Sequence, residues 1–268
     1  MGQDLQDARR IVVKVGTSTL THESGKLNFR QIERIVRVLS DLKNADREII
    51  LVTSGAIGVG VGKLGLSRRP SDVGGRQAAA AVGQCELMFT YDKLFSEYGQ
   101  IVSQVLLTRD DIDDKERCHN VVNTFARLLD MGAVPIVNEN DTVAVDELIG
   151  INFGDNDSLS AIVAKLMKAD ALVILTDIDG LYTADPHKHP DAKRIPRVEH
   201  IDDSVKALAG GVGSSRGTGG MITKIHAAQI ACSKGIDMAI IQGENPDLLY
   251  DLMEGKEVGT HFIGGNTK

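Results

Sequence analysis

Short runs of β-branched and aliphatic residues alternate with helical segments along this chain, and this alternation restricts its fold more than any other feature. Residues 10–15 read RIVVKV and residues 48–52 read EIILV, and both runs are typical of buried strands. Between them, apolar residues recur at helical spacing behind Asn28, a candidate N-cap. A strand, a helix and a second strand in this order predict a β-α-β unit with parallel strands.

The same alternation continues through most of the 268 residues. We expect helices over 75–98 and 116–131, and strands over 101–107, 133–137, 171–175 and 238–241. Strands that are apolar along their whole length are buried on both faces, as in a parallel sheet covered by helices. The sequence therefore predicts an α/β fold, a three-layer sandwich around a mainly parallel central sheet.

Two stretches depart from this alternation. Residues 142–153 (TVAVDELIGINF) alternate between apolar and polar like a hairpin, and residues 181–198 hold three prolines among charged residues. The sequence contains no repeat, low-complexity tract or linker. We therefore expect a single domain over residues 1–268, in which these two stretches form lid-like insertions.

Composition excludes several classes of function. The chain carries 30 Lys and Arg against 37 Asp and Glu, a formal net charge of −7, which argues against nucleic acid or an anionic membrane as a partner. The first ten residues are polar and unlike a signal peptide, and no apolar run approaches the roughly 20 residues of a membrane helix. Three isolated cysteines without a C-x-x-C pair indicate a reduced, cytoplasmic protein without a structural zinc site.

Polar and glycine-containing loops follow the expected strands. Because ligands of parallel sheets bind beyond the carboxyl ends of the strands, these loops are candidates for a shared site. They are 14–18 (KVGTS), 53–56 (TSGA), 138–141 (NEND), 154–157 (GDND) and 176–177 (TD). Gly16 and Gly55 stand where backbone amides near a helix start can bind a phosphate. Such residues also cap helices and close turns without any ligand, but five such loops at strand ends favour a common site.

Residues 210–224 form the segment richest in glycine, with six glycines in fifteen residues. The segment leads into apolar residues at helical spacing and ends at Lys224, which is typical of a loop that folds over nucleotide phosphates and supplies a cation. A flexible linker is the alternative. Residues 60–65 match G-x-G-x-x-G, but they start eight residues after a strand and lack the strand-to-turn context of a dinucleotide-binding loop.

The adjacent Cys118 and His119 fall inside the helix expected over 116–131. A thiol nucleophile or a metal-binding pair would need a further ligand or base nearby, and the surrounding sequence offers none. We therefore expect a structural role for both residues.

Eight sequence blocks carry a resemblance to a known family. They are VVKVGTSTL (12–20), VTSGAIGVG (52–60), AAVGQ (80–84), VNENDTVA (137–144), GDNDSLSA (154–161), LTDIDGLYTADP (175–186), GTGGMITK (217–224) and MEGKEVGTHF (253–262). In these blocks the chain resembles the amino-acid kinase superfamily, and within it the glutamate 5-kinase family. Many bacterial members carry a C-terminal PUA domain, which we expect this chain to lack.

The resemblance implies ATP with Mg²⁺ as the phosphate donor and the γ-carboxylate of L-glutamate as the acceptor, at the first step of proline biosynthesis. It also implies feedback inhibition by L-proline, assembly as a homodimer or homotetramer, and channelling of the product to glutamyl phosphate reductase. A superfamily kinase acting on acetylglutamate, aspartate, carbamate or a nucleotide is one alternative. A non-catalytic binding module of the same fold is another.

The resemblance also assigns roles to the charged residues. Lys14 and Lys224 correspond to the cations that contact the β- and γ-phosphoryl oxygens, and Asp157 to the carboxylate that orients both lysines. For Asp157, a plain helix N-cap is the alternative. No protein ligand for a metal is assigned, because Mg²⁺ is expected to be held by the ATP phosphates.

The remaining candidate residues fall into two groups by the same carry-over. Four are expected to hold glutamate, with Asp141 and Asn138 suited to its α-ammonium group: Ser54, Asn138, Asp141 and Asn156. The others are expected to bind the nucleotide, in part through backbone amides: Lys14, Gly16, Thr17, Gly55, Thr176, Asp177, Thr218, Gly219, Gly220, Met221, Ile222, Thr223 and Lys224.

Overall fold

The computed structural model describes residues 5–144, 155–186, 188–209 and 220–265. Its eight-stranded central sheet consists of β1 (Arg10–Val15), β2 (Glu48–Val52), β3 (Ile101–Leu107), β4 (Ala133–Glu139), β5 (Ala171–Thr176), β8 (Arg197–Val198), β9 (Asp237–Gln242) and β10 (Thr260–Phe262). The strand order is β3-β4-β2-β1-β5-β9-β10-β8. Every neighbouring pair is parallel except β9 and β10, so the expected mainly parallel sheet is confirmed.

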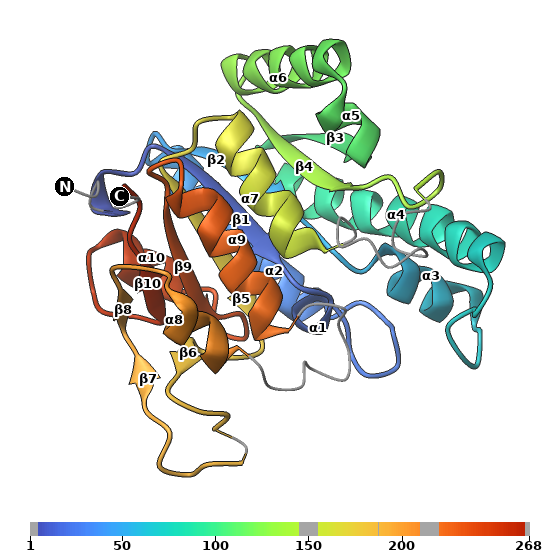
Figure 1. Ribbon diagram of the computed structural model, residues 1–268. Helices are drawn as coiled ribbons and strands as arrows, with labels where there is room; N and C mark the ends of the chain where they lie inside the picture. Colours follow the sequence, from blue (N-terminus) through green and yellow to red (C-terminus); the bar gives the residue numbers. More distant parts are fainter. Residues whose placement is uncertain (1–4, 145–154, 187, 210–219, 266–268) are drawn as a thin grey trace.

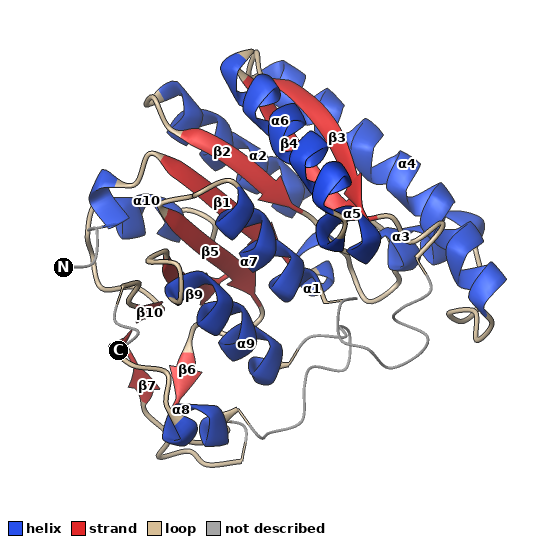
Figure 2. Cartoon of the chain, turned by 45° about the horizontal axis from the view of Figure 1, so that its top comes forward, coloured by secondary structure: helices blue, strands red, loops and turns tan. Residues whose placement is uncertain are grey.

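Helices cover both faces of this sheet and complete three layers (Figures 1 and 2). One face packs against α2 (Phe29–Asn44), α4 (Val73–Glu97) and α10 (Leu248–Met253), and the other against α6 (Lys115–Asp130), α7 (Asn156–Leu166) and α9 (Met221–Cys232). The shorter helices are η1 (Leu5–Asp7), α1 (Thr17–Leu20), α3 (Ala56–Leu64), α5 (Arg109–Asp113) and α8 (Asp203–Leu208). The three-layer sandwich expected from the sequence is therefore confirmed.

Alternation along β1 sends its side chains to both faces. Ile11, Val13 and Val15 belong to the hydrophobic cluster under α2 and α4, whereas Val12 belongs to the cluster under α7 and α9. Since successive side chains of a strand point to opposite faces, Lys14 shares the face of Val12. The strand thus directs a lysine toward the first turns of α7 and α9.

Local signals in the sequence set the ends of several elements. Asn28 caps α2 by accepting a hydrogen bond from the amide of Gln31 at 3.2 Å, as predicted. The 181–198 stretch forms a small antiparallel pair, β6 (Leu181–Tyr182) with β7 (Arg194–Ile195), and then delivers β8 to the main sheet. Most of the hairpin expected over 142–153 lies outside the described residues.

The G-x-G-x-x-G segment forms most of α3, which packs closely on α4. A Cβ atom built on Gly60 would lie 1.8 Å from the carbonyl oxygen of Ala79, and one built on Gly83 would lie 1.8 Å from that of Ala56. Glycine at these two positions therefore permits the close approach of two helices, and the segment has the helical conformation of a packing element rather than that of a dinucleotide-binding turn.

None of the helices in the described part of the chain combines the length and the apolar character that crossing a membrane would require.

Candidate active site

The carboxyl ends of four strands meet at one edge of the sheet because β4, β2, β1 and β5 are adjacent and parallel. Lys14 pairs in register with Val52 of β2 and Ile174 of β5, and Val52 pairs with Val137 of β4. Asn138 and Thr176 lie at the carboxyl ends of β4 and β5, Ser54 lies in the loop after β2, and the start of α7 adds Asn156 and Asp157.

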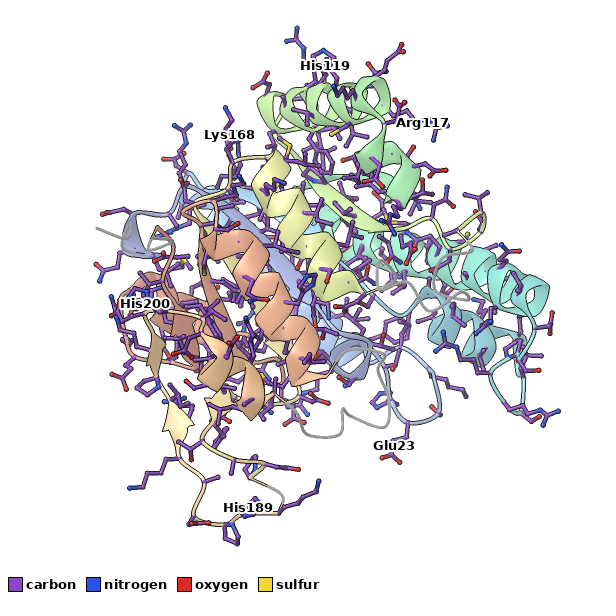
Figure 3. The ribbon with its side chains drawn as sticks, viewed as in Figure 1. Glu23, Arg117, His119, Lys168, His189 and His200 are labelled. Atoms are coloured by element: carbon purple, nitrogen blue, oxygen red, sulfur yellow. The ribbon has the colours of Figure 1, made fainter. Side chains whose placement is uncertain are left out.

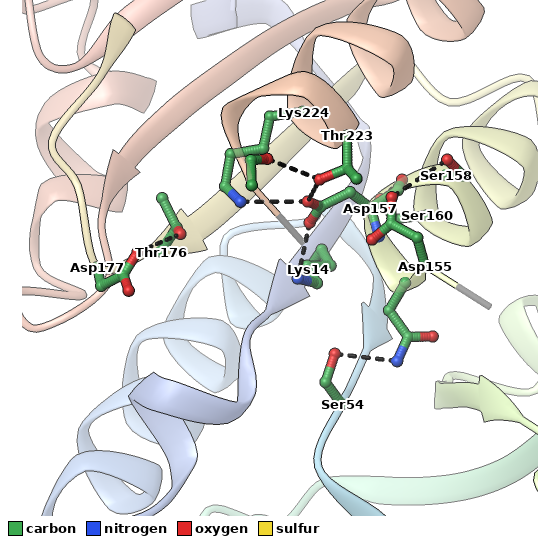
Figure 4. A network of polar contacts seen from close by, with 12 residues as sticks. Lys14, Ser54, Asp155, Asp157, Ser158, Ser160, Thr176, Asp177, Thr223 and Lys224 are labelled. Carbon is green, nitrogen blue, oxygen red and sulfur yellow. Dashed lines mark hydrogen bonds and ion pairs between the residues drawn. The ribbon is translucent and has the colours of Figure 1, made fainter. Parts of the chain in front are cut away.

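A charged cluster lies at this edge, with Asp157 at its centre (Figure 4). Lys14 Nζ lies 2.7 Å from Asp157 Oδ1, and Lys224 Nζ lies 3.2 Å from Asp157 Oδ2. Thr223 Oγ1 donates to Oδ2 at 2.8 Å. Asp157 is fully buried, and only 7% of Lys14 and 5% of Lys224 are exposed. Three residues far apart in the sequence are thus held together with very little contact with water.

The charges of this cluster determine how its carboxylates titrate. Burial alone would raise the pKa of the Asp157 carboxyl, but the ammonium groups of Lys14 and Lys224 outweigh it and hold that pKa well below its usual range. Asp155, which lies beside Asp157, shows the opposite shift. Burial and then the negative charge of Asp157 raise the pKa of Asp155. The cluster therefore carries one firmly ionised carboxylate with two cations.

The N-cap of α7 is Asp155, whose Oδ1 accepts a hydrogen bond from the amide of Asp157 at 3.0 Å. The alternative reading of Asp157 as the N-cap is therefore wrong. With its backbone amide held by Asp155, Asp157 turns its side chain to the two lysines.

A neutral network of amides adjoins the charged cluster. Asn156 Nδ2 donates to Ser54 Oγ at 3.0 Å and to Asn138 Oδ1 at 3.2 Å, and Asn138 Nδ2 donates to Gln84 Oε1 at 2.9 Å. Figure 4 shows Ser54 below the cluster, with its hydrogen bond drawn as a dashed line. Three of the four residues expected to hold glutamate are thus hydrogen-bonded to one another.

Gln84 is the member of this network that sequence reasoning missed. It lies on α4 and is 7% exposed. One signal could have identified it, because Gln84 closes the run AAAAVGQ and is the only polar side chain in that run. A polar residue on the buried face of a helix usually has a hydrogen-bonding partner.

Asp141 is the fourth residue expected to hold glutamate. It is half-buried and lines a small cavity of about 20 Å³ together with Arg76, Gln77 and Glu139. A cavity of this size has room for about one water molecule. The proposed contact of Asp141 with the α-ammonium group therefore involves a carboxylate partly open to solvent.

The backbone amides expected to bind the nucleotide differ in whether they already donate a hydrogen bond within the protein. The Gly16 amide donates to the carbonyl of Leu175 at 3.3 Å, so it is already engaged in holding β1 to β5. A Cβ atom built on Gly16 would lie 3.7 Å from Lys14 Nζ, which is an ordinary van der Waals contact. Within the described residues, no hydrogen bond engages the amides of Thr17 and Gly55. Gly55 has φ +94°, a left-handed conformation that favours glycine.

The expected nucleotide residues are split between described and undescribed segments. Thr176 and Asp177 follow β5, and Thr176 Oγ1 donates to Asp177 Oδ1 at 3.1 Å. Gly220 is the N-cap of α9, which begins with Met221, Ile222, Thr223 and Lys224. Thr218 and Gly219 lie outside the described residues.

Several histidines lie far from the cluster. Figure 3 shows His119 on the outer side of α6, and His189 and His200 at other parts of the periphery. Cys118 is half-buried on the same helix. His119 lies away from the charged cluster, and the structural role expected for Cys118 and His119 stays a prediction.

Comparison with known proteins assigns this arrangement to a family. Residues 9–242 match the model of the amino acid kinase family. The chain belongs to the amino acid kinase family. It is 53% identical to the glutamate 5-kinase of Clostridium perfringens, with 98% of each chain covered. It is 55% identical to that of Clostridium acetobutylicum, with 98% of this chain and 97% of the relative covered. The resemblance to glutamate 5-kinases that the motifs indicate is confirmed.

Two solved structures that are similar to this chain in fold are named as kinases of other substrates. The UMP kinase from Bacillus anthracis has a TM-score of 0.64 at 17% identity, with 96% of each chain covered. The isopentenyl phosphate kinase of T. acidophilum has a TM-score of 0.63 at 19% identity, with 94% of this chain and 99% of that chain covered. At such identities the likeness shows the fold alone.

Proposed function

We propose that this member of the amino acid kinase family transfers the γ-phosphoryl group of ATP to the γ-carboxylate of L-glutamate. The observation that carries the proposal is the buried Lys14–Asp157–Lys224 cluster directly beside a neutral amide network. The cluster suits a phosphate chain, and the network suits a small polar acceptor. The similarity to glutamate 5-kinases over nearly the whole chain supports the choice of glutamate.

The reaction brings two anions together. An oxygen of the glutamate γ-carboxylate forms a bond to the γ-phosphorus as the bond from that phosphorus to the β–γ bridging oxygen breaks, and ADP leaves. A glutamate carboxyl has a pKa of about 4.3, so it is already a nucleophile at neutral pH and needs no general base. The protein therefore has to align the reactants and offset their negative charge.

Lys14 and Lys224 supply that positive charge. They come from β1 and from the first turn of α9, and Asp157 holds both ammonium groups at fixed positions in a site largely shielded from water. Preorganised cations in such a site stabilise developing charge without having to reorient during the reaction. We propose that they contact the β- and γ-phosphoryl oxygens, with Thr176 and Asp177 near the nucleoside.

Family membership supports ATP as the donor, and the residues fit it. Two ammonium groups and a threonine hydroxyl around Asp157 suit phosphoryl oxygens and would repel a bare metal ion. We propose that Mg²⁺ enters on the ATP phosphates, where it prefers phosphate and water oxygens and neutralises further charge. Within the described residues, no group of three or more His, Cys, Asp or Glu side chains forms a candidate metal site.

The chemistry of the substrate and product also supports proposals about how the protein is regulated and which partners it has. L-proline shares an α-carboxylate and an ammonium group with glutamate, so we propose that it competes for the same end of the site. The acyl phosphate product is reactive, which favours prompt use by glutamyl phosphate reductase. We also propose a single kinase domain that works as a homodimer or homotetramer in the cytoplasm, where the three free cysteines remain reduced.

A hydroxamate trap tests substrate and reaction together. The protein is incubated with ATP, Mg²⁺, L-glutamate and hydroxylamine, and we expect γ-glutamyl hydroxamate and ADP in equal amounts. Parallel reactions with acetylglutamate, aspartate and carbamate compare the other acceptors. Product from one of these instead of glutamate would identify a different kinase of the family, and no product from any of these acceptors would leave a nucleotide kinase or a non-catalytic binding module.

A further inference from the structure

Gln84 is a buried polar residue to which the transfer mechanism above gives no role. It projects from α4, and its Oε1 accepts the hydrogen bond from Asn138 Nδ2 at 2.9 Å. Its Nε2 is buried and makes no hydrogen bond within the described part of the chain. A buried amide with one end paired and the other unpaired calls for an explanation, because leaving such a group unsatisfied is unfavourable.

The hydrogen bonds of the amide network all run in one direction. Asn138 Oδ1 accepts from the backbone amide of Glu139 at 2.9 Å and from Asn156 Nδ2 at 3.2 Å, which uses both of its lone pairs. Asn138 Nδ2 then donates to Gln84 Oε1. If either asparagine amide were flipped, two donors or two acceptors would face each other. Gln84 and the Glu139 amide together therefore fix which end of each amide points where.

The orientation of these amides determines which donor and acceptor groups the network leaves unpaired for a substrate. Both N–H groups of Asn156 are used, on Ser54 and on Asn138, whereas Asn156 Oδ1 is buried and has no partner among the described residues. Ser54 Oγ accepts from Asn156, so its hydroxyl hydrogen is available to a carboxylate. Besides the unpaired Gln84 Nε2, the network thus presents one open acceptor, Asn156 Oδ1, and the open Ser54 hydroxyl donor, which complement an ammonium group and a carboxylate.

We propose that Gln84 is a positioning residue for substrate selection. By accepting from Asn138 Nδ2 it holds the amide chain in the orientation that leaves Asn156 Oδ1 free for the α-ammonium group of the acceptor. Asn138, whose oxygen is already used twice, then supports the site rather than contacting the ammonium group directly. The proposal rests on the proposed function, because it takes an amino acid as the acceptor.

A comparison of glutamate with glutarate tests this role. Glutarate has the same γ-carboxylate but no ammonium group. For Gln84→Met we expect kcat/KM for glutamate to fall at least about tenfold, the effect of losing one hydrogen bond to a charged group. Turnover or competitive inhibition by glutarate should change less than about threefold, and the KM for ATP should stay within about twofold. The preference for glutamate over glutarate would therefore shrink.

Matched variants test whether the effect is specific to the hydrogen bond between Gln84 and Asn138. Gln84→Glu keeps an acceptor facing Asn138 and should retain most of the preference. Cys85→Met places the same new side chain one position along α4 at an exposed site, and it should behave like the parent protein. Should Gln84→Met fail to fold, Gln84→Asn carries the same expectation, because its amide is one methylene too short to reach Asn138.

The outcomes separate this proposal from the proposed function. Equal losses with glutamate and glutarate would mean that Gln84 only supports the fold, and an unchanged preference would mean that it has no part in selection. Either result overturns the positioning role while leaving the kinase activity intact. A parent protein that forms no glutamyl hydroxamate would overturn the proposed function and the positioning role with it.

Discussion

The two ends of the candidate site hold their residues by different means. At the end where we propose that phosphate binds, a buried carboxylate pairs with Lys14 at 2.7 Å and with Lys224 at 3.2 Å, so the interactions are between full charges. At the end where we propose that the acceptor binds, Ser54, Asn138 and Asn156 are joined by neutral hydrogen bonds of 3.0 and 3.2 Å. Charge gives strength with little directionality, whereas a chain of amides fixes donors and acceptors. Substitutions should therefore change rate at the first end and selectivity at the second.

Removal of the central carboxylate should have the largest effect. Asp157→Asn leaves two buried ammonium groups without a counter-charge, and breaking a buried ion pair in this way costs about 3–5 kcal/mol of unfolding free energy. Urea denaturation measures the loss, and activity should fall with it. The control is Asp203→Asn, which removes an exposed pair with Lys206 and should cost no more than about 1 kcal/mol. Similar losses in both variants would contradict a buried cluster.

Replacement of a single cation should affect the rate more than substrate binding. In Lys224→Met the fall in kcat should be about 10²- to 10³-fold, since one preorganised charge on the transferring group is lost. The KM for glutamate should change little, and steady-state kinetics separates the two constants. Lys234→Met, at an exposed position just after α9, is the matched control. A kcat within threefold of the parent's, on the order of an ordinary surface substitution, would remove Lys224 from the catalytic set.

Substitution of Asp141, which we propose contacts the acceptor, should have a smaller effect, and only the KM for glutamate should change. Asp141→Ala should raise the KM for glutamate by about ten- to a hundredfold, the effect of losing a hydrogen bond to an ammonium group, and leave that for ATP nearly unchanged. Asp130→Ala, at an exposed position on α6, serves as the control. Equal increases in both KM values would show that Asp141 supports the whole site rather than the acceptor.

The smallest effect is expected at two aspartate N-caps. It is a specific one, because the pKa values of these two residues shift in opposite directions. Burial raises the pKa of Asp155 at α7, whereas the Ser204 hydroxyl lowers that of Asp202 at α8. The Asp155 contribution to stability is present below its ordinary pKa of 3.8 and is lost as pH rises through the folded value. The Asp202 contribution is present above 3.8 and is lost as pH falls through the folded value.

Asparagine at either position keeps the cap and removes the titration. The unfolding free energy of the parent minus that of Asp155→Asn should therefore fall as pH rises above about 3.8, and the same difference for Asp202→Asn should rise with pH in the range below 3.8. Thermal and urea unfolding at several pH values measure both slopes. Slopes of the same sign would mean that burial does not raise the pKa of Asp155 in the folded protein.

Much of the fold could be predicted from local pattern. The expected strands 10–15, 48–52 and 101–107 agree with β1, β2 and β3 at both ends. The agreement has a physical cause, since runs of β-branched residues and an N-cap such as Asn28 act within a few residues of themselves. The helix expected over 75–98 starts two residues earlier, at Val73, because Asp72 caps it.

Predictions for the site were less complete. Motifs identified Lys14, Asp157 and Lys224, but not the fact that the Gly16 amide is engaged with Leu175 or that Asp155 rather than Asp157 caps α7. Gln84 went unassigned because its partner, Asn138, is distant in the sequence and comes close only when α4 packs near the end of β4. Hydrogen bonds between distant residues leave no periodic trace in a sequence.

The sequence by itself determined the elements of this protein, the parallel character of its sheet and the residue types that a kinase site needs. Only the tertiary structure decided which of those residues meet. The strand order β3-β4-β2-β1-β5-β9 differs from chain order, and it is this order that brings loops from four strands to one edge. Propensity acts over neighbouring residues, whereas the pairing of buried charges and the direction of a buried amide chain depend on every segment that packs around them.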